Sequence, residues 1–289
     1  MNYLKDYREG EKFVGTYLCK QKQILKTKAG KTYYSLTLQD KTGTADGKIW
    51  ELNNGIANFE PMDYIHCEGM VTSFQGNLQM NISRVRISDE GEYDPADYVP
   101  CTNKDVGEMF SRILKYVASV QNKYLRKILE MYFVENKEFV DAFKKHSAAK
   151  SVHHGFMGGL LEHTLSVTDM CQYFAEHYPM IHRDLLITAA LFHDMGKIQE
   201  ISDFPMNDYT DDGQLLGHIY IGARCMENAA AQIPNFPPKL KNELVHCILA
   251  HHGKMEFGSP KVPAIMEAMA LHMADNVDAK LQTLTEVFT

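Results

Sequence analysis

The stretch LLITAALFHDMGK, residues 185–197, decides the fold of the C-terminal half. Its apolar run predicts a buried helix that ends at His193 and Asp194. An ionised aspartate in such a place is costly unless it is paired or bound to a metal. One His-Asp pair could be a chance feature of a surface. Its meaning depends on whether other metal-binding residue types follow the same pattern.

Histidine is concentrated in the same half of the chain. Of 13 histidines, only His66 precedes residue 146. Several histidines and two aspartates lie mostly beside apolar helical runs, and each alone would more often be a core or surface residue. Together they indicate a metal centre, because imidazole and carboxylate suit divalent Mn, Fe, Zn or Co. These residues are His163, His193, Asp194, His218, His251 and Asp275. His252 is an alternative or an addition to His251.

The pattern resembles the HD-domain metallohydrolase superfamily over about residues 150–282. The resemblance implies that His163, His193, Asp194 and Asp275 hold one ion. It also implies that Asp194 bridges to a second ion held by His218 and His251. Lys197 takes the position of a cation near the scissile phosphate, with a helix C-terminal cation as the alternative. His153 and His154 are candidate phosphate contacts or structural residues. The implied cofactor is two divalent ions, with Mn²⁺ favoured over Fe²⁺, Co²⁺ or Zn²⁺.

The N-terminal half is different in composition. Residues 12–39 hold six lysines and no acid, within a chain whose net charge is −7. Short alternating stretches between residues 12 and 88 predict strands. Asp40-Lys41-Thr42-Gly43 marks a turn, and the change of phase between Ile82 and Val85 predicts a bulge. This order of strands and turns resembles an OB-fold of the nucleic-acid-binding kind.

A basic barrel with exposed aromatic side chains suits a single nucleic-acid strand, because lysines follow phosphates and rings stack on bases. The basic segment has a solvated strand face as its alternative. Burial in the barrel is the alternative for Trp50, and packing under a turn is the alternative for Phe74. The candidate contacts are Lys20, Lys22, Lys26, Lys28, Tyr33, Trp50 and Phe74.

The expected fold is a multi-domain α+β protein, with a small OB-like β-barrel followed by an all-α HD-domain helical bundle. Expected boundaries are an N-terminal arm at 1–11, the barrel at 12–90, an acidic linker at 91–104 and the helical domain at 105–289. Six scattered cysteines favour reduced thiols, and no apolar leader or membrane span is visible. We therefore expect a cytoplasmic protein without membrane partners. Sixteen methionines and apolar helix surfaces permit a homo-oligomer.

Both halves together resemble the YhaM-type 3′→5′ exoribonuclease family over nearly the whole chain. The resemblance implies metal-dependent trimming of single-stranded RNA, or also single-stranded DNA, with release of nucleoside 5′-monophosphates. Two alternatives stay open. One is an HD phosphohydrolase of nucleotides or cyclic dinucleotides, and the other is a non-catalytic single-strand-binding factor. The chain has no GxSxG, GxxxxGK[ST] or Rossmann motif to support other chemistry.

Overall fold

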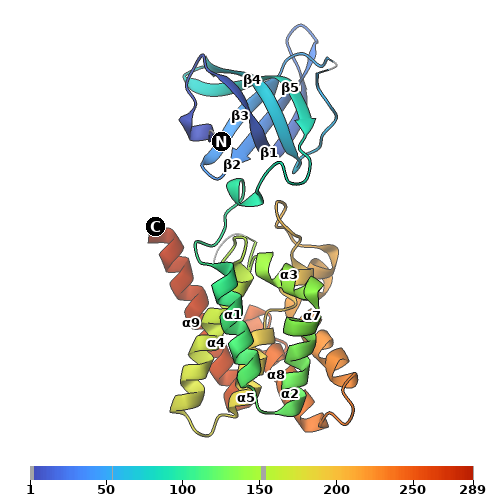
Figure 1. Ribbon diagram of the computed structural model, residues 1–289, viewed down its shortest axis with the longest axis vertical. Helices are drawn as coiled ribbons and strands as arrows, with labels where there is room; N and C mark the ends of the chain where they lie inside the picture. The colour runs from blue at the N-terminus through green and yellow to red at the C-terminus, as the bar shows by residue number, and fades with distance from the viewer. Residues whose placement is uncertain (1–2, 54, 151–153, 289) are drawn as a thin grey trace. The chain divides into compact units, whose positions relative to one another are not determined.

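The computed structural model describes residues 3–53, 55–150 and 154–288 (Figure 1). The chain divides into two compact units, Met1–Pro100 and Cys101–Thr289. Each unit has its own hydrophobic core. The expected class is confirmed: an OB-like β-barrel comes first, and a helical region follows it.

The described part of the first unit is a closed barrel of five strands in the order β1-β2-β3-β5-β4. Neighbouring strands pair antiparallel, except that β3 and β5 are parallel. Alternate side chains face inward and form the core, as the period of two requires. The strands are β1 (Lys12–Lys26), β2 (Thr32–Asp40), β3 (Gly43–Ile49), β4 (Tyr64–Phe74) and β5 (Asn77–Ile87).

The bulge expected in the last strand is confirmed. The register between β4 and β5 shifts at Gly69, so that Ser83 is the extra residue between Ile82 and Val85. A Cβ at Gly69 would lie 2.0 Å from the carbonyl oxygen of Asn81. Only glycine permits this close approach of two strands.

The segments expected as an arm and as a linker both contribute to the packing of the barrel unit. Tyr7 is 7% exposed and accepts a hydrogen bond from the hydroxyl of Tyr17 at 3.1 Å. Tyr98 is 1% exposed and packs edge-on against Tyr64. The compact unit Met1–Pro100 includes both segments, because these aromatic rings bury their area against the strands.

The second unit is built from helices. Besides the helices that apolar periodicity indicates, it contains α3, which is rich in charged residues, and the single-turn α6. A π-helical turn, Met131–Glu135, continues α2. The helices are α1 (Val106–Ser119), α2 (Lys123–Glu130), α3 (Lys137–Lys145), α4 (Gly159–His177), α5 (Arg183–Phe192), α6 (Lys197–Glu200), α7 (Asp211–Ala231), α8 (Pro238–Ala250) and α9 (Met266–Phe288).

Helix α5 lies at the centre of this unit. Each residue from Leu185 to Phe192 is buried, which explains why the run is apolar on every face rather than amphipathic. Helices α4, α8 and α9 all pack against α5. Three elements that carry or precede other candidate ligands, α4 with His163, α8 before His251 and α9 with Asp275, therefore pack on the helix that leads to His193 and Asp194. None of the helices in the described part of the chain is long and apolar enough to cross a membrane.

Candidate metal centre and nucleic-acid interface

The structure brings the candidate ligands of the helical unit together from five elements. His163 comes from the first turns of α4, and His193 and Asp194 follow α5. The other side chains come from α7, the end of α8, and α9; they are His218, His251, His252 and Asp275.

One group of atoms gathers around His163. Its Nε2 lies 3.2 Å from Nε2 of His193, 3.3 Å from Oδ2 of Asp194 and 3.2 Å from Oδ1 of Asp275. All four side chains are buried or nearly so. Two imidazole nitrogens and two carboxylate oxygens thus point at one small volume, and these are the four side chains that the resemblance implies for a first ion.

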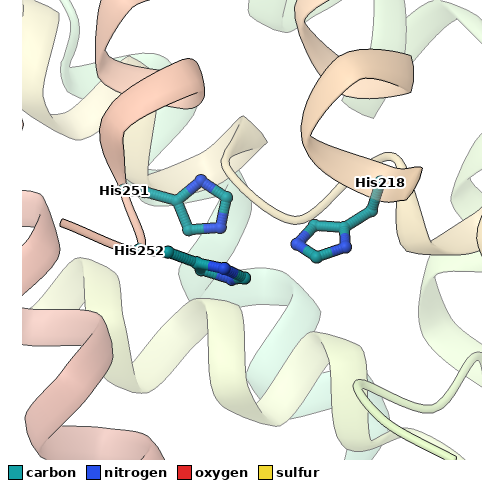
Figure 2. A group of neighbouring side chains, drawn as sticks. All are labelled: His218, His251 and His252. Atoms are coloured by element: carbon teal, nitrogen blue, oxygen red, sulfur yellow. The ribbon is translucent and has the colours of Figure 1, made fainter. Parts of the chain in front are cut away.

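A second group lies on the other side of Asp194. Oδ1 of Asp194 is 3.6 Å from Nε2 of His218 and 3.6 Å from Nε2 of His251. His252 joins this group, since ring nitrogens of His218, His251 and His252 all lie within 4.8 Å of one another. Figure 2 shows the three rings turned toward a common point. The two oxygens of Asp194 therefore face different groups, as a bridging carboxylate requires.

The histidines of both groups share one tautomer. In each, Nδ1–H donates to an oxygen that can only accept, which leaves the Nε2 lone pair for a metal. For His193, His251 and His252 the acceptors are the carbonyl oxygens of Ala190 at 2.8 Å, Ile248 at 2.7 Å and Phe257 at 2.8 Å. Burial lowers the pKa of His251 and His252, so that both rings are neutral at neutral pH.

Two carboxylates that the sequence patterns did not single out complete this arrangement. Oδ2 of Asp278 lies 2.7 Å from Nδ1 of His163, and Oε1 of Glu200 lies 2.9 Å from Nδ1 of His218. Asp278 follows Asp275 by three residues and Glu200 follows Lys197 by three. The i,i+3 spacing on a helix was the available signal, because it places both residues on one face.

The buried polar atoms test whether a metal fits. Oδ1 of Asp194, Nε2 of His218 and Nε2 of His251 are buried and have no hydrogen-bond partner among the described residues. Buried polar atoms are normally paired, and an unpaired carboxylate oxygen is especially costly. Since these atoms face one another, a divalent cation satisfies all of them at once. The residues present therefore fit divalent metal binding.

Glycines let the second group assemble. Gly217 has a φ of +72°, which kinks α7 just before His218. A Cβ at Gly196 would lie only 2.1 Å from the carbonyl oxygen of His218. The glycine of the HDMGK stretch is thus needed for the approach of α7 to the end of α5.

Lys197 lies at the edge of the centre. Its Nζ is 2.7 Å from Oδ2 of Asp194, and its side chain is 16% exposed. Burial opposes ionisation of Asp194, but Lys197 and His193 outweigh it and hold the pKa of Asp194 well below its usual value. Burial likewise opposes the charge on Lys197, but Asp194 raises its pKa. Lys197 therefore stays cationic beside the centre.

Of the two candidate phosphate contacts, His153 and His154, the structure describes only the second. His153 lies outside the described residues. His154 is 2% exposed, and its Nε2 lies 3.0 Å from Oδ2 of Asp278. The structure thus places His154 against the carboxylate that holds His163 rather than at a surface where a phosphate could reach it.

The lysines of the barrel do not form one set. Lys20 is the bulge residue of β1, Lys28 is in the β1–β2 turn, and both are exposed, as is Lys26. Lys22 instead faces the side of β2 on which Leu36 is buried, since the two residues are register partners. Nζ of Lys22 donates to the carbonyl oxygen of Phe59 at 2.5 Å.

Lys22 also lies over two aromatic rings, 4.8 Å from the centroid of Tyr34 and 4.5 Å from that of Phe59. The ammonium of Lys22 therefore contacts groups in the wall of the barrel. Lys22 thus differs from the other three lysines, for which no such partners within the barrel are seen among the contacts of the described residues, and its contact with a nucleic-acid backbone stays a prediction.

The aromatic candidates of the barrel lie at its surface. Tyr33 and Trp50 stack with ring centroids 4.6 Å apart, and Trp50 is 39% exposed. The alternative that Trp50 is buried in the barrel is wrong. Tyr34 faces inward instead and packs on the core. Phe74 is 61% exposed, beside the turn at Gln75, so packing under that turn is also wrong.

Comparisons with known proteins identify a family for the helical unit and relatives for nearly the whole chain. Residues 160–280 match the HD domain family. The chain is 32% identical to the 3′-5′ exoribonuclease YhaM of Bacillus subtilis (strain 168) over 262 residues, which cover 88% of this chain and 81% of that protein.

The protein of the same name from Shouchella clausii (strain KSM-K16) is 32% identical over 289 residues, covering 97% of this chain and 88% of that protein. Among solved structures, the second OB-fold domain of replication protein A from Methanococcus maripaludis matches with 20% identity and a TM-score of 0.26. That match covers 32% of this chain and 98% of the other. By its identity to these exoribonucleases and the coverage of both chains, the protein belongs to the YhaM 3′-5′ exoribonuclease family.

Proposed function

We propose that this protein is a metal-dependent 3′→5′ exoribonuclease that removes nucleotides from the 3′ end of single-stranded RNA and releases nucleoside 5′-monophosphates. Single-stranded DNA is a second substrate of the same chemistry. The observation that carries the proposal is the position of Asp194, whose two oxygens face two separate groups of histidine Nε2 atoms. Membership of the YhaM family supports the direction of digestion.

We assign a first divalent ion to His163, His193, Asp194 and Asp275. A second ion is assigned to Asp194, His218 and His251, with His252 as a further ligand of that ion. Mn²⁺ is the proposed metal, because this mixture of imidazole and carboxylate donors suits it. When bound, such a pair of ions activates water and offsets the negative charge of a phosphodiester.

The residues of the chain do the rest. Asp194 is held ionised by Lys197 and His193, so that it can serve both groups at neutral pH. The ammonium of Lys197 lines the same cavity as His218 and Asp275, where a phosphate oxygen would add a second partner to it. A cation at that place stabilises charge that develops on phosphorus as the bond to the 3′-oxygen of the shortened strand breaks.

The barrel is assigned to binding of the strand. Lys20, Lys26 and Lys28 present exposed cations to phosphates, and the Tyr33–Trp50 stack presents a platform to bases. Phe74 is assigned to a further base from the tip of the β4–β5 hairpin. Lys22 is not included, since its ammonium serves the wall of the barrel.

The test uses a 5′-labelled single-stranded RNA with Mn²⁺, the same reaction with chelator, and the Asp194→Ala variant. A ladder that shortens from the 3′ end, and is absent with chelator and with the variant, is the expected result. Release of labelled mononucleotide in the first turnover would show attack at the 5′ end and contradict the direction. Intact RNA in every lane, with turnover of nucleotides, would favour the small-molecule phosphohydrolase instead.

A further inference from the structure

The cavity beside the metal centre has two exposed aromatic side chains in its wall. Tyr209 is 46% exposed and Phe257 is 57% exposed, and both line the cavity that also contains Lys197, His218 and Asp275. Its volume is about 520 Å³, which is large enough for a nucleotide. Burial of such large aromatic rings is favourable, so their exposure beside the cavity is best explained by a ligand that covers them.

The backbone at both rings is tied to the centre. The carbonyl of Phe257 accepts the hydrogen bond from Nδ1 of His252 at 2.8 Å. Tyr209 pairs across a β-bridge with Ile201, the residue that follows Glu200. The backbone that carries each ring is therefore tied to His252 or to the segment of the carboxylate that orients His218.

A lysine accompanies each ring. Nζ of Lys150 lies 5.8 Å from the ring centroid of Tyr209, and Nζ of Lys254 lies 5.3 Å from that of Phe257. Both ammonium groups are at the surface, with side chains 49% and 61% exposed. Each of the two rings in the cavity wall thus has an exposed ammonium beside it, just outside the lining of the cavity, and the two pairs come from segments far apart in the sequence.

A ring beside an ammonium matches the chemistry of one nucleotide, whose base stacks and whose phosphate attracts the cation. Each lysine forms an exposed ion pair, Lys150 with Asp208 and Lys254 with Glu256. Exposed ion pairs contribute little free energy, so a phosphate can replace the carboxylate at little cost. A peptide or a lipid would not explain why both rings lie in the same cavity as a phosphodiester-cleaving site.

We propose that Tyr209 and Phe257 form a subsite that stacks the nucleobases at the 3′ end of the substrate, with Lys150 and Lys254 holding the neighbouring phosphates. The inference rests on the proposed function, since it places the scissile phosphodiester at the metal centre. Stacking uses the face that all four bases share, so the subsite accepts every base. It secures the 3′ end independently of the barrel.

The first test measures removal of the 3′ nucleotide from a short 5′-labelled RNA whose last two nucleotides are either both normal or both abasic. For normal RNA, Phe257→Leu and Tyr209→Leu should each raise KM about 5- to 100-fold with little change in kcat, the range expected for loss of one stacked base. For abasic RNA, the wild type should already show the raised KM, and the substitutions should add little. Tyr173→Leu is the matched control, because Tyr173 is 60% exposed on α4 and does not line the cavity.

The second test does not depend on hydrolysis. An RNA that ends in 2-aminopurine is titrated with each protein in EDTA, and its fluorescence is followed. Wild type and Tyr173→Leu should quench the fluorescence by stacking, and Phe257→Leu and Tyr209→Leu should quench it less. Equal quenching by all four proteins overturns the subsite. Absence of RNA digestion by the wild type in the first test overturns the proposed function instead, so that the two failures are distinct.

Discussion

Oδ2 of Asp278 accepts a hydrogen bond from Nδ1–H of His163 at 2.7 Å. The same carboxylate contacts Nε2 of His154 and the hydroxyl of Ser166. It therefore fixes the ring of His163 from behind and turns Nε2 toward Asp194 and its neighbours. Glu200 does the same for His218, so each of the two candidate groups has its own supporting carboxylate.

This pairing predicts separable losses of metal. Asp278→Asn keeps a hydrogen-bond acceptor but removes the negative charge behind His163, and Glu200→Gln does the same behind His218. Each substitution should weaken binding of one ion about 10- to 100-fold and leave the other ion in place, because such supporting residues tune one ligand at a time. Titration with Co²⁺, followed by visible absorption, measures both stoichiometry and affinity. Loss of both ions in either variant would contradict two separately supported groups.

The stabilisation that metal gives should depend on pH. Burial lowers the pKa of His163, but hydrogen bonds to Asp194, Asp275 and Asp278 outweigh it and raise that pKa well above its usual value. In the metal-free protein this raised pKa stabilises the fold fully below the unfolded value of about 6.5, and the contribution is lost as the pH rises through the folded value. A metal must displace the proton, so its binding improves over the same rise.

The expected result is that the increase in Tm on adding Mn²⁺ grows as the pH rises from about 6 to about 8. Thermal unfolding at matched ionic strength, with Mn²⁺ or with EDTA, measures it. An increase in Tm that stays constant, or falls, over this range would show that protons do not compete with the ion at His163.

The close approach at Gly196 predicts a stability effect. Gly196→Ala places a Cβ 2.1 Å from the carbonyl oxygen of His218, so the turn after α5 and the kink of α7 must move apart. We expect a loss of about 1–3 kcal/mol in the free energy of unfolding, together with weaker metal binding at His218. Gly222→Ala, on α7, is the control, because its Cβ would meet nothing nearer than 3.5 Å. Urea unfolding of both variants decides the point, and equal free energies would refute the steric account.

The helical unit shows how far sequence patterns reach. Apolar runs and their spacing indicate α5 as a buried helix, and the order of histidines and aspartates indicates which residues belong to the centre. The patterns do not indicate Asp278 or Glu200, because a single acidic residue on a helix resembles any solvated side chain until a histidine is placed beside it. They also do not indicate Tyr209 and Phe257, whose common cavity depends on how separate segments fold together.

In the barrel, the strands can be predicted from the sequence, but the exposure of individual side chains cannot. Alternation indicates the strands and the bulge, but it does not tell which face of a strand is covered. Lys22 and Lys26 share a face by their spacing, yet Lys22 is covered by the Phe59 segment and Lys26 is exposed. Trp50 is a large apolar residue that follows the end of β3, yet its ring lies at the surface, where it stacks on Tyr33 instead of entering the core. Strand register and loop packing decide which of these side chains are covered, and neither can be read from a single sequence.

The division among the barrel lysines makes a quantitative prediction for RNA binding. Each lysine that neutralises a phosphate of a single strand contributes about −0.7 to the slope of log K against log salt. Neutralising Lys20, Lys26 and Lys28 together should therefore make the slope shallower by about 2 and weaken long substrates far more than dinucleotides. Lys22→Met should instead leave the slope unchanged and lower the Tm, since it removes the ammonium from the rings of Tyr34 and Phe59.

Anisotropy of a labelled RNA at several KCl concentrations, in EDTA to prevent digestion, measures the slope for each variant. If Lys22→Met changes the slope by one third of the change seen in the triple variant, Lys22 must leave the barrel wall and contact the strand as the other lysines do. An unchanged slope in the triple variant would remove the basic segment from the interface. Its lysines would then be a solvated strand face, and the Tyr33–Trp50 stack would have to bind RNA without them.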